Sequence, residues 1–150
     1  DALRIEARRR AWGAELSPDE TPLDAGLDFA VALDKPVAFL GRDALLRQRA
    51  AGARKRLVQL RLTDPGAYAW GGEPVSIDGR TIGEITSAGY SRTFGCSIAM
   101  VYVRAANLTG VDHVSAGGGL DIGNDAALDA ARWQVDIAGT LYAARPHLAR

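Results

Sequence analysis

Apolar and polar residues alternate in short runs over the last two thirds of the chain, and this alternation is the pattern of half-buried β-strands. The runs predict strands at residues 57–62, 73–77, 81–86, 96–103, 133–137 and 141–143. Asp78-Gly79 lies between the second run and the third, and this pair predicts a tight hairpin turn. Five or six short strands joined by tight turns are typical of a small antiparallel barrel or sandwich.

The region before these strands has a different pattern. Pro22 predicts the start of a short helix that runs to Leu27, and the alternating stretch Asp28–Leu33 predicts a strand. Asp43–Ala51 predicts a longer helix, which Gly52 ends. This region is therefore expected to mix helix and strand rather than to form a regular sheet.

The two patterns divide the chain into two parts and together predict an α+β fold. Residues 1–54 are expected to form a short mixed α/β segment, and residues 55–150 a small antiparallel C-terminal β-barrel. The stretch 111–130 is rich in Gly, Asp and Ala and has little periodicity, so it predicts a loop with a short helix.

Composition and charge narrow the classes of protein that fit. Apolar residues make up 47% of the 150 residues, enough for a sizeable core, and 18 basic residues balance 18 acidic ones, which argues against nucleic-acid binding. Cys96 is the sole cysteine, so no intramolecular disulfide forms; this fits a reducing compartment, and we expect a cytoplasmic protein. No run approaches the ~18 apolar residues of a membrane span. Because the chain begins without Met and inside a helical pattern, we expect a piece of a longer protein.

Residue types that often carry catalysis are present, but their spacing is uninformative. His113 and His147 lie in late, loop-like segments, no serine has the surroundings of a nucleophile elbow, and surface histidines are the favoured interpretation. The adjacent pair Asp112 and His113 does not make a metal site. Gly117–Gly119 lacks the Lys-Ser or Lys-Thr that a phosphate-binding loop requires. We therefore predict no catalytic and no metal-ligating residue in this chain.

One carboxylate stands out at the start of the chain. Asp1–Arg10 predicts a helix on which Glu6 shares a face with the apolar Leu3 and Ala7. A buried carboxylate must be paired or must bind something, and a planar edge with two parallel N–H groups is a natural partner. The alternative is an exposed helical acid that pairs with a neighbouring arginine of the same helix, at position 9 or 10.

Several segments occur in an order that resembles one family. They are LRIE (3–6), WGAEL (12–16), TPLDAGL (21–27), FLGRDAL (39–45), RLVQLRL (56–62), GGEPV (71–75), IGEITSAGYS (82–91) and SIAMVYV (97–103). Together they resemble the C-terminal region of the glycine-cleavage T-protein (aminomethyltransferase) family. The likeness is closest to the folate-binding part of sarcosine and dimethylglycine dehydrogenases, and AGTLYAARPHL near the end strengthens it.

The resemblance implies both a fold and a function. Residues 1–54 would be the C-terminal part of the folate-binding aminomethyltransferase domain, and residues 55–150 the C-terminal β-barrel domain. Such proteins bind tetrahydrofolate between their subdomains and pass a one-carbon unit to it, which gives 5,10-methylenetetrahydrofolate. In the dehydrogenases, an upstream flavin (FAD) domain first oxidises a small N-methyl amine. The implied partners are folate, this amine and the upstream domains of the same polypeptide, with no nucleic acid and no membrane.

The resemblance also implies roles for three residues. Glu6 in LRIE matches the glutamate that the family uses on the pterin edge. Lys35 falls about where the family places an arginine near the folate tail, although lysine is a point charge and not a bidentate fork. Arg42 either contacts folate or orients the start of the helix that follows it. Trp12 is expected to pack in the core, and Tyr90 to lie on the barrel side of the cleft.

The resemblance places the catalytic aspartate and the flavin domain upstream of this chain. We therefore expect a piece of a larger enzyme that forms part of a folate site and is inactive alone. Two other functions stay open: a non-catalytic folate-binding or regulatory module, and a structural barrel that supports domain packing.

Overall fold

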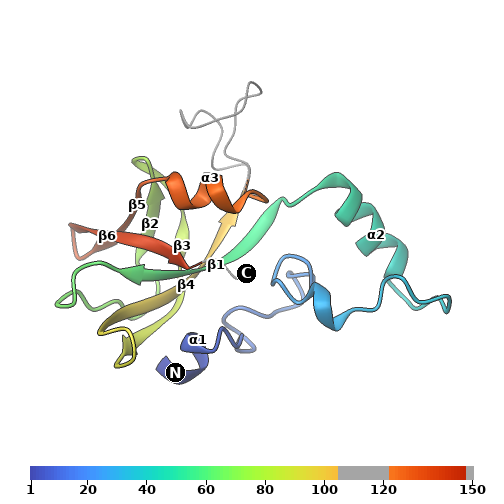
Figure 1. Ribbon diagram of the computed structural model, residues 1–150, viewed down its shortest axis with the longest axis horizontal. Helices are drawn as coiled ribbons and strands as arrows, with labels where there is room; N and C mark the ends of the chain where they lie inside the picture. Colours follow the sequence, from blue (N-terminus) through green and yellow to red (C-terminus); the bar gives the residue numbers. More distant parts are fainter. Residues whose placement is uncertain (105–121, 148–150) are drawn as a thin grey trace.

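The computed structural model describes residues 1–104 and 122–147, and its main feature is a closed barrel of six antiparallel strands (Figure 1). The strands are β1 (Lys55–Leu62), β2 (Pro74–Ile77), β3 (Arg80–Ser91), β4 (Cys96–Arg104), β5 (Trp133–Ile137) and β6 (Thr140–His147). The helices are α1 (Ala2–Glu6), the 3-10 helix η1 (Asp28–Ala30), α2 (Arg42–Ala51) and α3 (Asp125–Ala130). The predicted α+β fold with an antiparallel barrel is confirmed.

The strands follow the order β1-β4-β3-β2-β5-β6 around the barrel, and β1 closes it by pairing with both β4 and β6. Leu60 of β1, for example, lies opposite Ala99 on one side and Pro146 on the other. The predicted hairpin joins β2 and β3. Asp78 and Gly79 have φ values of 50° and 81°, the left-handed conformations that a tight two-residue hairpin turn requires.

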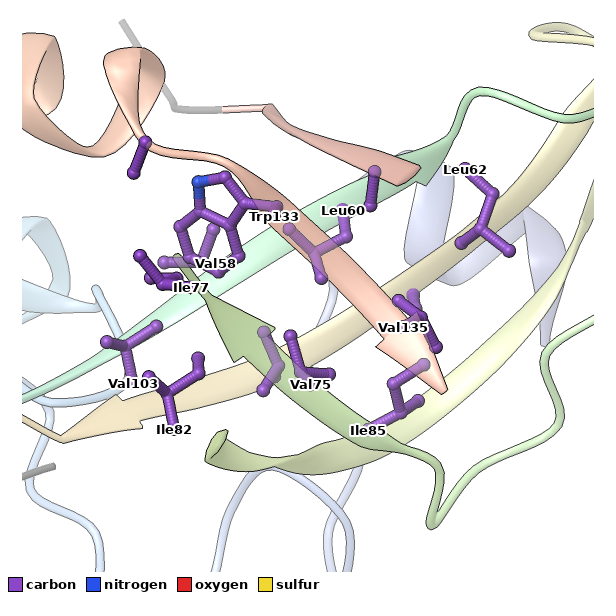
Figure 2. Close-up of a cluster of buried hydrophobic side chains, with 14 of the residues drawn as sticks. Val58, Leu60, Leu62, Val75, Ile77, Ile82, Ile85, Val103, Trp133 and Val135 are labelled. Atoms are coloured by element: carbon purple, nitrogen blue, oxygen red, sulfur yellow. The ribbon is translucent and has the colours of Figure 1, made fainter. Parts of the chain in front are cut away.

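Each strand contributes apolar side chains to the interior of the barrel, from alternate residues in strands such as β1 (Val58, Leu60 and Leu62) (Figure 2). Trp133 is the largest of them; it is 1% exposed, and its indole nitrogen donates a hydrogen bond of 2.8 Å to the carbonyl of Leu128. Leu128 belongs to α3, which crosses one end of the barrel in Figure 1, and it is fully buried in the same core. The predicted short helix thus helps to close the core.

Strand β4 is buried on both faces, which explains its continuous apolar sequence. Ala99, Val101 and Val103 face the barrel interior. The opposite face carries Ile98 and Met100, which form a second apolar cluster with Ile5 of α1. The N-terminal helix therefore packs on the outside of the barrel.

The predicted helix over Asp1–Arg10 is shorter than expected, and the face that it buries differs. It ends at Glu6, and Arg8 beyond it has a left-handed backbone with φ of 54°. Leu3 is 80% exposed, whereas Ile5 is fully buried. The prediction that the face with Leu3 is buried was wrong. Contact with the barrel, rather than the spacing of apolar residues within the helix, decides that the side with Ile5 is buried.

Two further predictions for the N-terminal segment were wrong. The stretch Pro22–Leu27 forms turns and no regular helix, although Thr21 and Asp24 make the reciprocal hydrogen bonds of a capping box. Asp28–Leu33 contains the 3-10 helix η1 and no strand. A strand needs a neighbour to accept and donate its backbone hydrogen bonds, and every barrel strand already has two neighbours.

Helix α2 was predicted correctly, and Gly52 with φ of 84° ends it. The helix and the loop before it project away from the barrel in Figure 1, and none of the helix residues is buried. Val37, Phe39 and Leu40 of that loop are exposed. Within residues 1–104 and 122–147, no helix has the length and apolar character that crossing a membrane requires.

Candidate functional site

Glu6 is the last residue of α1, and two features hold this helix against the barrel. The side chain of Ile5, in α1, packs against Ile98 and Met100 of strand β4. Gly89 of β3 lies directly under Ala2, where a Cβ atom would come within 3.3 Å of the Ala2 backbone. A glycine at this position therefore allows the close approach that carries Glu6 to the turn between β3 and β4.

The carboxylate of Glu6 accepts two hydrogen bonds from that turn. Ser91 Oγ donates to Oε1 at 2.6 Å, and Thr93 Oγ1 donates to Oε2 at 3.0 Å. Ser91 is fully buried and its Oγ also accepts from the amide of Phe94, so the contact is fixed from both sides. A carboxylate has about four acceptor positions. Glu6 can accept two further N–H donors while it keeps both hydroxyl contacts.

The alternative interpretation of Glu6 as the partner of a neighbouring arginine does not describe this geometry. The Arg10 guanidinium donates instead to the carbonyls of Ala25 at 2.7 Å and Gly26 at 3.1 Å. Arg9 is exposed. Glu6 is therefore positioned by the barrel rather than by its own helix.

Lys35 and Arg42 lie apart from Glu6. Lys35 is exposed in the loop before α2, and Figure 1 shows this loop in the projecting arm, away from α1. Arg42 donates through Nε to the carbonyl of Leu33 at 2.9 Å, which ties the first residue of α2 back to the preceding loop. This bond uses one of five guanidinium donors. The structure does not bring the three predicted site residues together.

Among the aromatic residues, Trp12 differs from expectation. Trp12 is 77% exposed, so its predicted place in the core was wrong; the turn over residues 11–16 leaves its side chain in solvent. Tyr90 stacks on Tyr68, with ring centroids 5.3 Å apart. His147 is half-buried on β6, with its ring 6.2 Å from that of Phe94. His113 and Gly117–Gly119 lie outside the described residues.

The main buried carboxylate is one that the sequence did not single out. Glu15 is fully buried and accepts from Arg4 Nη1 at 2.7 Å, from the Ala11 amide at 2.9 Å and from Thr86 Oγ1 at 2.8 Å. The Ser87 hydroxyl is a fourth donor. Burial alone would raise the pKa of Glu15, but these donors hold it below its usual value. Glu15 is therefore an ionised anchor between the N-terminal segment and β3.

A second polar anchor joins the same segment to the start of β1. Lys55 is buried, forms an ion pair with Glu20 and lies 4.2 Å from the centre of the Tyr102 ring. Hydrogen bonds from Lys55 and Ser17 lower the pKa of Glu20. Burial raises the pKa of Tyr102, whose hydroxyl donates to the carbonyl of Glu15 at 2.7 Å. The two anchors thus meet at Tyr102.

Comparison with known proteins agrees with this architecture. The glycine cleavage T-protein C-terminal barrel domain matches residues 55–149, which include all six strands. The crystal structure of the glycine cleavage system aminomethyltransferase T from Bartonella henselae is similar over 99% of this chain and 36% of its own, with a TM-score of 0.73 and 26% identity. The similarity therefore extends through the N-terminal segment as well as the barrel.

Aminomethyltransferases and N-methyl amine dehydrogenases match this chain at almost equal sequence identity. The aminomethyltransferase of Symbiobacterium thermophilum is 42% identical over 107 residues, 71% of this chain and 28% of its own length. The mitochondrial dimethylglycine dehydrogenase of Rattus norvegicus is 43% identical over 103 residues, 69% of this chain and 12% of its own. The human mitochondrial sarcosine dehydrogenase is 42% identical, with 69% and 11% covered. The chain thus spans less than a third of the length of each of these three relatives. It belongs to the glycine cleavage T-protein family, as the ordered motifs of its sequence predicted.

Proposed function

We propose that this chain forms part of the tetrahydrofolate site of a one-carbon (aminomethyl) transferase module. The module would belong to a flavin-linked enzyme of the sarcosine or dimethylglycine dehydrogenase type, with FAD on an upstream domain and a small N-methyl amine as substrate. Relatives with these names support the proposal, and so do the aminomethyltransferases at similar identity. A cytoplasmic location, expected from the single cysteine, is part of the same proposal.

The geometry of Glu6 is the observation that carries the proposal. Its carboxylate is fixed by Ser91 and Thr93 and keeps acceptor capacity for a flat edge with two N–H groups, such as that of a pterin. Bound tetrahydrofolate would supply the nitrogen that accepts the one-carbon unit. The contribution of this chain is to bind and orient the pterin, because correct placement of the reacting atoms supplies much of a rate acceleration.

Lys35 and Arg42 are proposed to act at the other end of the folate, on its carboxylates. Lys35 is exposed, and Arg42 uses Nε for the carbonyl of Leu33. Folate is a long molecule, so contacts at its two ends do not require these residues to lie near Glu6. Arg42 then combines both of its predicted roles, since the bond that orients α2 leaves other guanidinium donors for a carboxylate.

The chain is proposed to be inactive alone and to work with upstream domains of the same polypeptide. Val37, Phe39 and Leu40 are exposed together on the loop before α2. Neighbouring exposed apolar side chains of this kind are typical of contact surfaces. The upstream domains would cover them and complete the folate site.

Folate titration of the full-length protein tests the proposal. Glu6→Gln should weaken the binding of 5-formyltetrahydrofolate by roughly 30-fold or more, since loss of a charged partner from such a contact costs about 2 kcal/mol or more. Glu84→Gln, at an exposed glutamate of β3, is the matched control and should leave the affinity unchanged. Thermal melting of each variant confirms that it is folded.

The same titration separates this proposal from its main rival, a barrel that only supports domain packing. The rival is favoured by the two hydroxyl contacts of Glu6, which also lock the turn between β3 and β4. If full-length protein binds no reduced folate, the structural function is correct. Binding without any transfer of a one-carbon unit would indicate a regulatory folate module instead.

A further inference from the structure

Gln59 of β1 is a polar side chain buried where the N-terminal segment meets the barrel. It is 4% exposed, although the alternation of β1 places it on the face opposite to the inward-facing Val58 and Leu60. Its neighbour across the strands is Met100, which belongs to the apolar cluster that also holds Ile5. Burial of an amide is costly unless its polar atoms are hydrogen-bonded, so the partners of Gln59 decide what this residue does.

Both ends of the Gln59 amide bond to the region where helix α1 ends. Its Nε2 donates a hydrogen bond to the carbonyl of Ile5, and its Oε1 accepts one from Arg8 Nε at 3.4 Å. The Ile5 carbonyl also accepts from the backbone amide of Arg8 at 2.9 Å. A carbonyl oxygen has two lone pairs, so Gln59 fills the acceptor position that the end of the helix leaves open.

The bond to Ile5 acts directly on the backbone of Glu6. The carbonyl of Ile5 belongs to the peptide group that joins Ile5 to Glu6, and this group is planar. Fixing the carbonyl therefore fixes the plane from which the side chain of Glu6 departs. The direction of Glu6 is thus tied to Gln59, which lies 54 residues beyond Ile5 in the sequence.

Glu6 is consequently held at its backbone and at its carboxylate by different parts of the barrel. The hydroxyls of Ser91 and Thr93 hold the carboxylate, and Gln59 holds the backbone. A glutamate side chain has several rotatable bonds, so contacts at the carboxylate alone leave more than one path back to the helix. With both ends fixed, the open acceptor positions of the carboxylate face in one direction.

Helix α1 is too short to provide this orientation by itself. It has five residues, Ala2–Glu6, and isolated helices shorter than about 12 residues are marginal in water. Packing of Ile5 and the close approach at Gly89 set the distance of the helix from the barrel. Apolar contact is non-directional, whereas the hydrogen bond from Gln59 has a direction.

We infer that Gln59 is a positioning residue for Glu6. Through the Ile5 carbonyl it sets the direction in which the carboxylate meets the flat N–H edge of its ligand. Direction matters because hydrogen bonds weaken steeply when they are misaligned, and a paired contact requires two to be aligned at once. The inference rests on the proposed folate function, and it concerns a residue that is too deeply buried to touch the ligand.

Folate titration of the full-length protein tests the inference. Gln59→Leu keeps the approximate size of the side chain and removes the donor, so the affinity for 5-formyltetrahydrofolate should fall by about tenfold. Gln59→Glu keeps the shape and the acceptor but has no N–H to donate, and it should lose as much affinity. Gln134→Leu, at a half-buried glutamine of β5, is the matched control and should bind like wild type. An equal loss in the control would overturn the inference.

A double-mutant cycle separates positioning from a general loss of structure. If Gln59 acts through Glu6, the double variant Glu6→Gln/Gln59→Leu should bind folate no more weakly than Glu6→Gln alone. Losses that add up would mean that Gln59 supports the fold and not the direction of Glu6. That result would overturn the inference.

Hydrogen exchange followed by NMR gives a measurement that needs no folate. In the 150-residue chain, Gln59→Leu should speed the exchange of the backbone amides of Ala7 and Arg8 about fivefold, the effect of one lost hydrogen bond. These amides bond to the carbonyls of Leu3 and Ile5. Unchanged exchange would overturn the inference even if the full-length protein binds folate.

Failure of the inference is distinguishable from failure of the proposed function. If wild type binds no reduced folate, or if Glu6→Gln binds it as tightly, the proposed function fails, and hydrogen exchange still decides whether Gln59 orients Glu6. If Glu6→Gln loses affinity while Gln59→Leu does not, the inference alone is overturned.

Discussion

The barrel and the segment before it differ in how their side chains are buried. The barrel strands enclose a continuous apolar core around Trp133. In residues 1–54 the fully or nearly fully buried apolar side chains are Ile5, Ala25 and Leu33. This segment is held mainly by polar contacts, of which the buried Glu15 makes the most.

This difference teaches which part of the fold is self-sufficient. Apolar burial is non-directional and tolerates small adjustments, whereas a buried carboxylate depends on every one of its donors. The barrel therefore carries its own stability. The N-terminal segment depends on the barrel for its stability. Its projecting arm around α2 is covered neither by the barrel nor by the rest of the segment.

The largest expected effect is in the barrel core. Trp133→Ala should lower the free energy of unfolding by about 3–5 kcal/mol, since it leaves a large cavity and removes the hydrogen bond to Leu128. Urea denaturation followed by circular dichroism measures this. Trp70→Ala, at a residue that is 83% exposed, is the matched control. Equal losses in the two variants would mean that the core does not dominate stability.

A smaller, pH-dependent effect is expected at the anchor of the N-terminal segment. Glu15→Gln should cost about 1–3 kcal/mol at pH 7, because four donors lose a charged acceptor. The pKa of Glu15 in the folded protein is below its ordinary value of 4.5. The stabilisation that the Glu15 carboxylate gives the folded state is therefore fully present above pH 4.5. It is lost as the pH falls through the folded pKa.

The measurement for Glu15 is a series of denaturation curves from pH 7 to pH 3. The difference between wild type and Glu15→Gln should shrink as the solution becomes more acidic. Glu20, whose pKa is also lowered, should account for part of the slope that remains in the variant. A difference that is constant with pH would mean that the Glu15 carboxylate is not the ionised anchor.

The smallest effect is expected in the projecting arm. Leu40→Ser should change the free energy of unfolding by no more than about 0.5 kcal/mol, because this side chain is already in water in the 150-residue chain. Leu33→Ser, at a buried leucine of the same segment, should cost considerably more. Thermal melting compares the two. A large loss at Leu40 would show that the arm packs on the chain itself.

The same contrast explains what the sequence could predict. The alternation of strands such as Trp133–Ile137 and the Asp78-Gly79 turn are local signals, and the barrel follows them. The predicted strand at Asp28–Leu33 had the right alternation but no neighbouring strand to pair with. Local pattern is therefore reliable where the sheet itself provides the partners.

The candidate site shows what the local sequence pattern could not predict. Glu6 was selected from the sequence, but the hydroxyls that position it lie 85 and 87 residues away. Glu15 binds Thr86 and Ser87, 71 and 72 residues away, and nothing in its local pattern marks it as buried. The signal that was available was the adjacent polar pair Thr86-Ser87, which interrupts the alternation of apolar and polar residues in β3.

The closure of the barrel by β1 has a consequence for the order of folding. The first strand pairs with the last, so Gln59 meets His147 only when the intervening chain has been organised. Such non-local pairing slows folding, because the loop must be closed before the contacts form. Until β6 is in place, β1 and β5 each present an unpaired edge that can recruit another chain. During synthesis, the barrel is therefore protected from aggregation only after β6 has emerged from the ribosome and paired with β1 and β5.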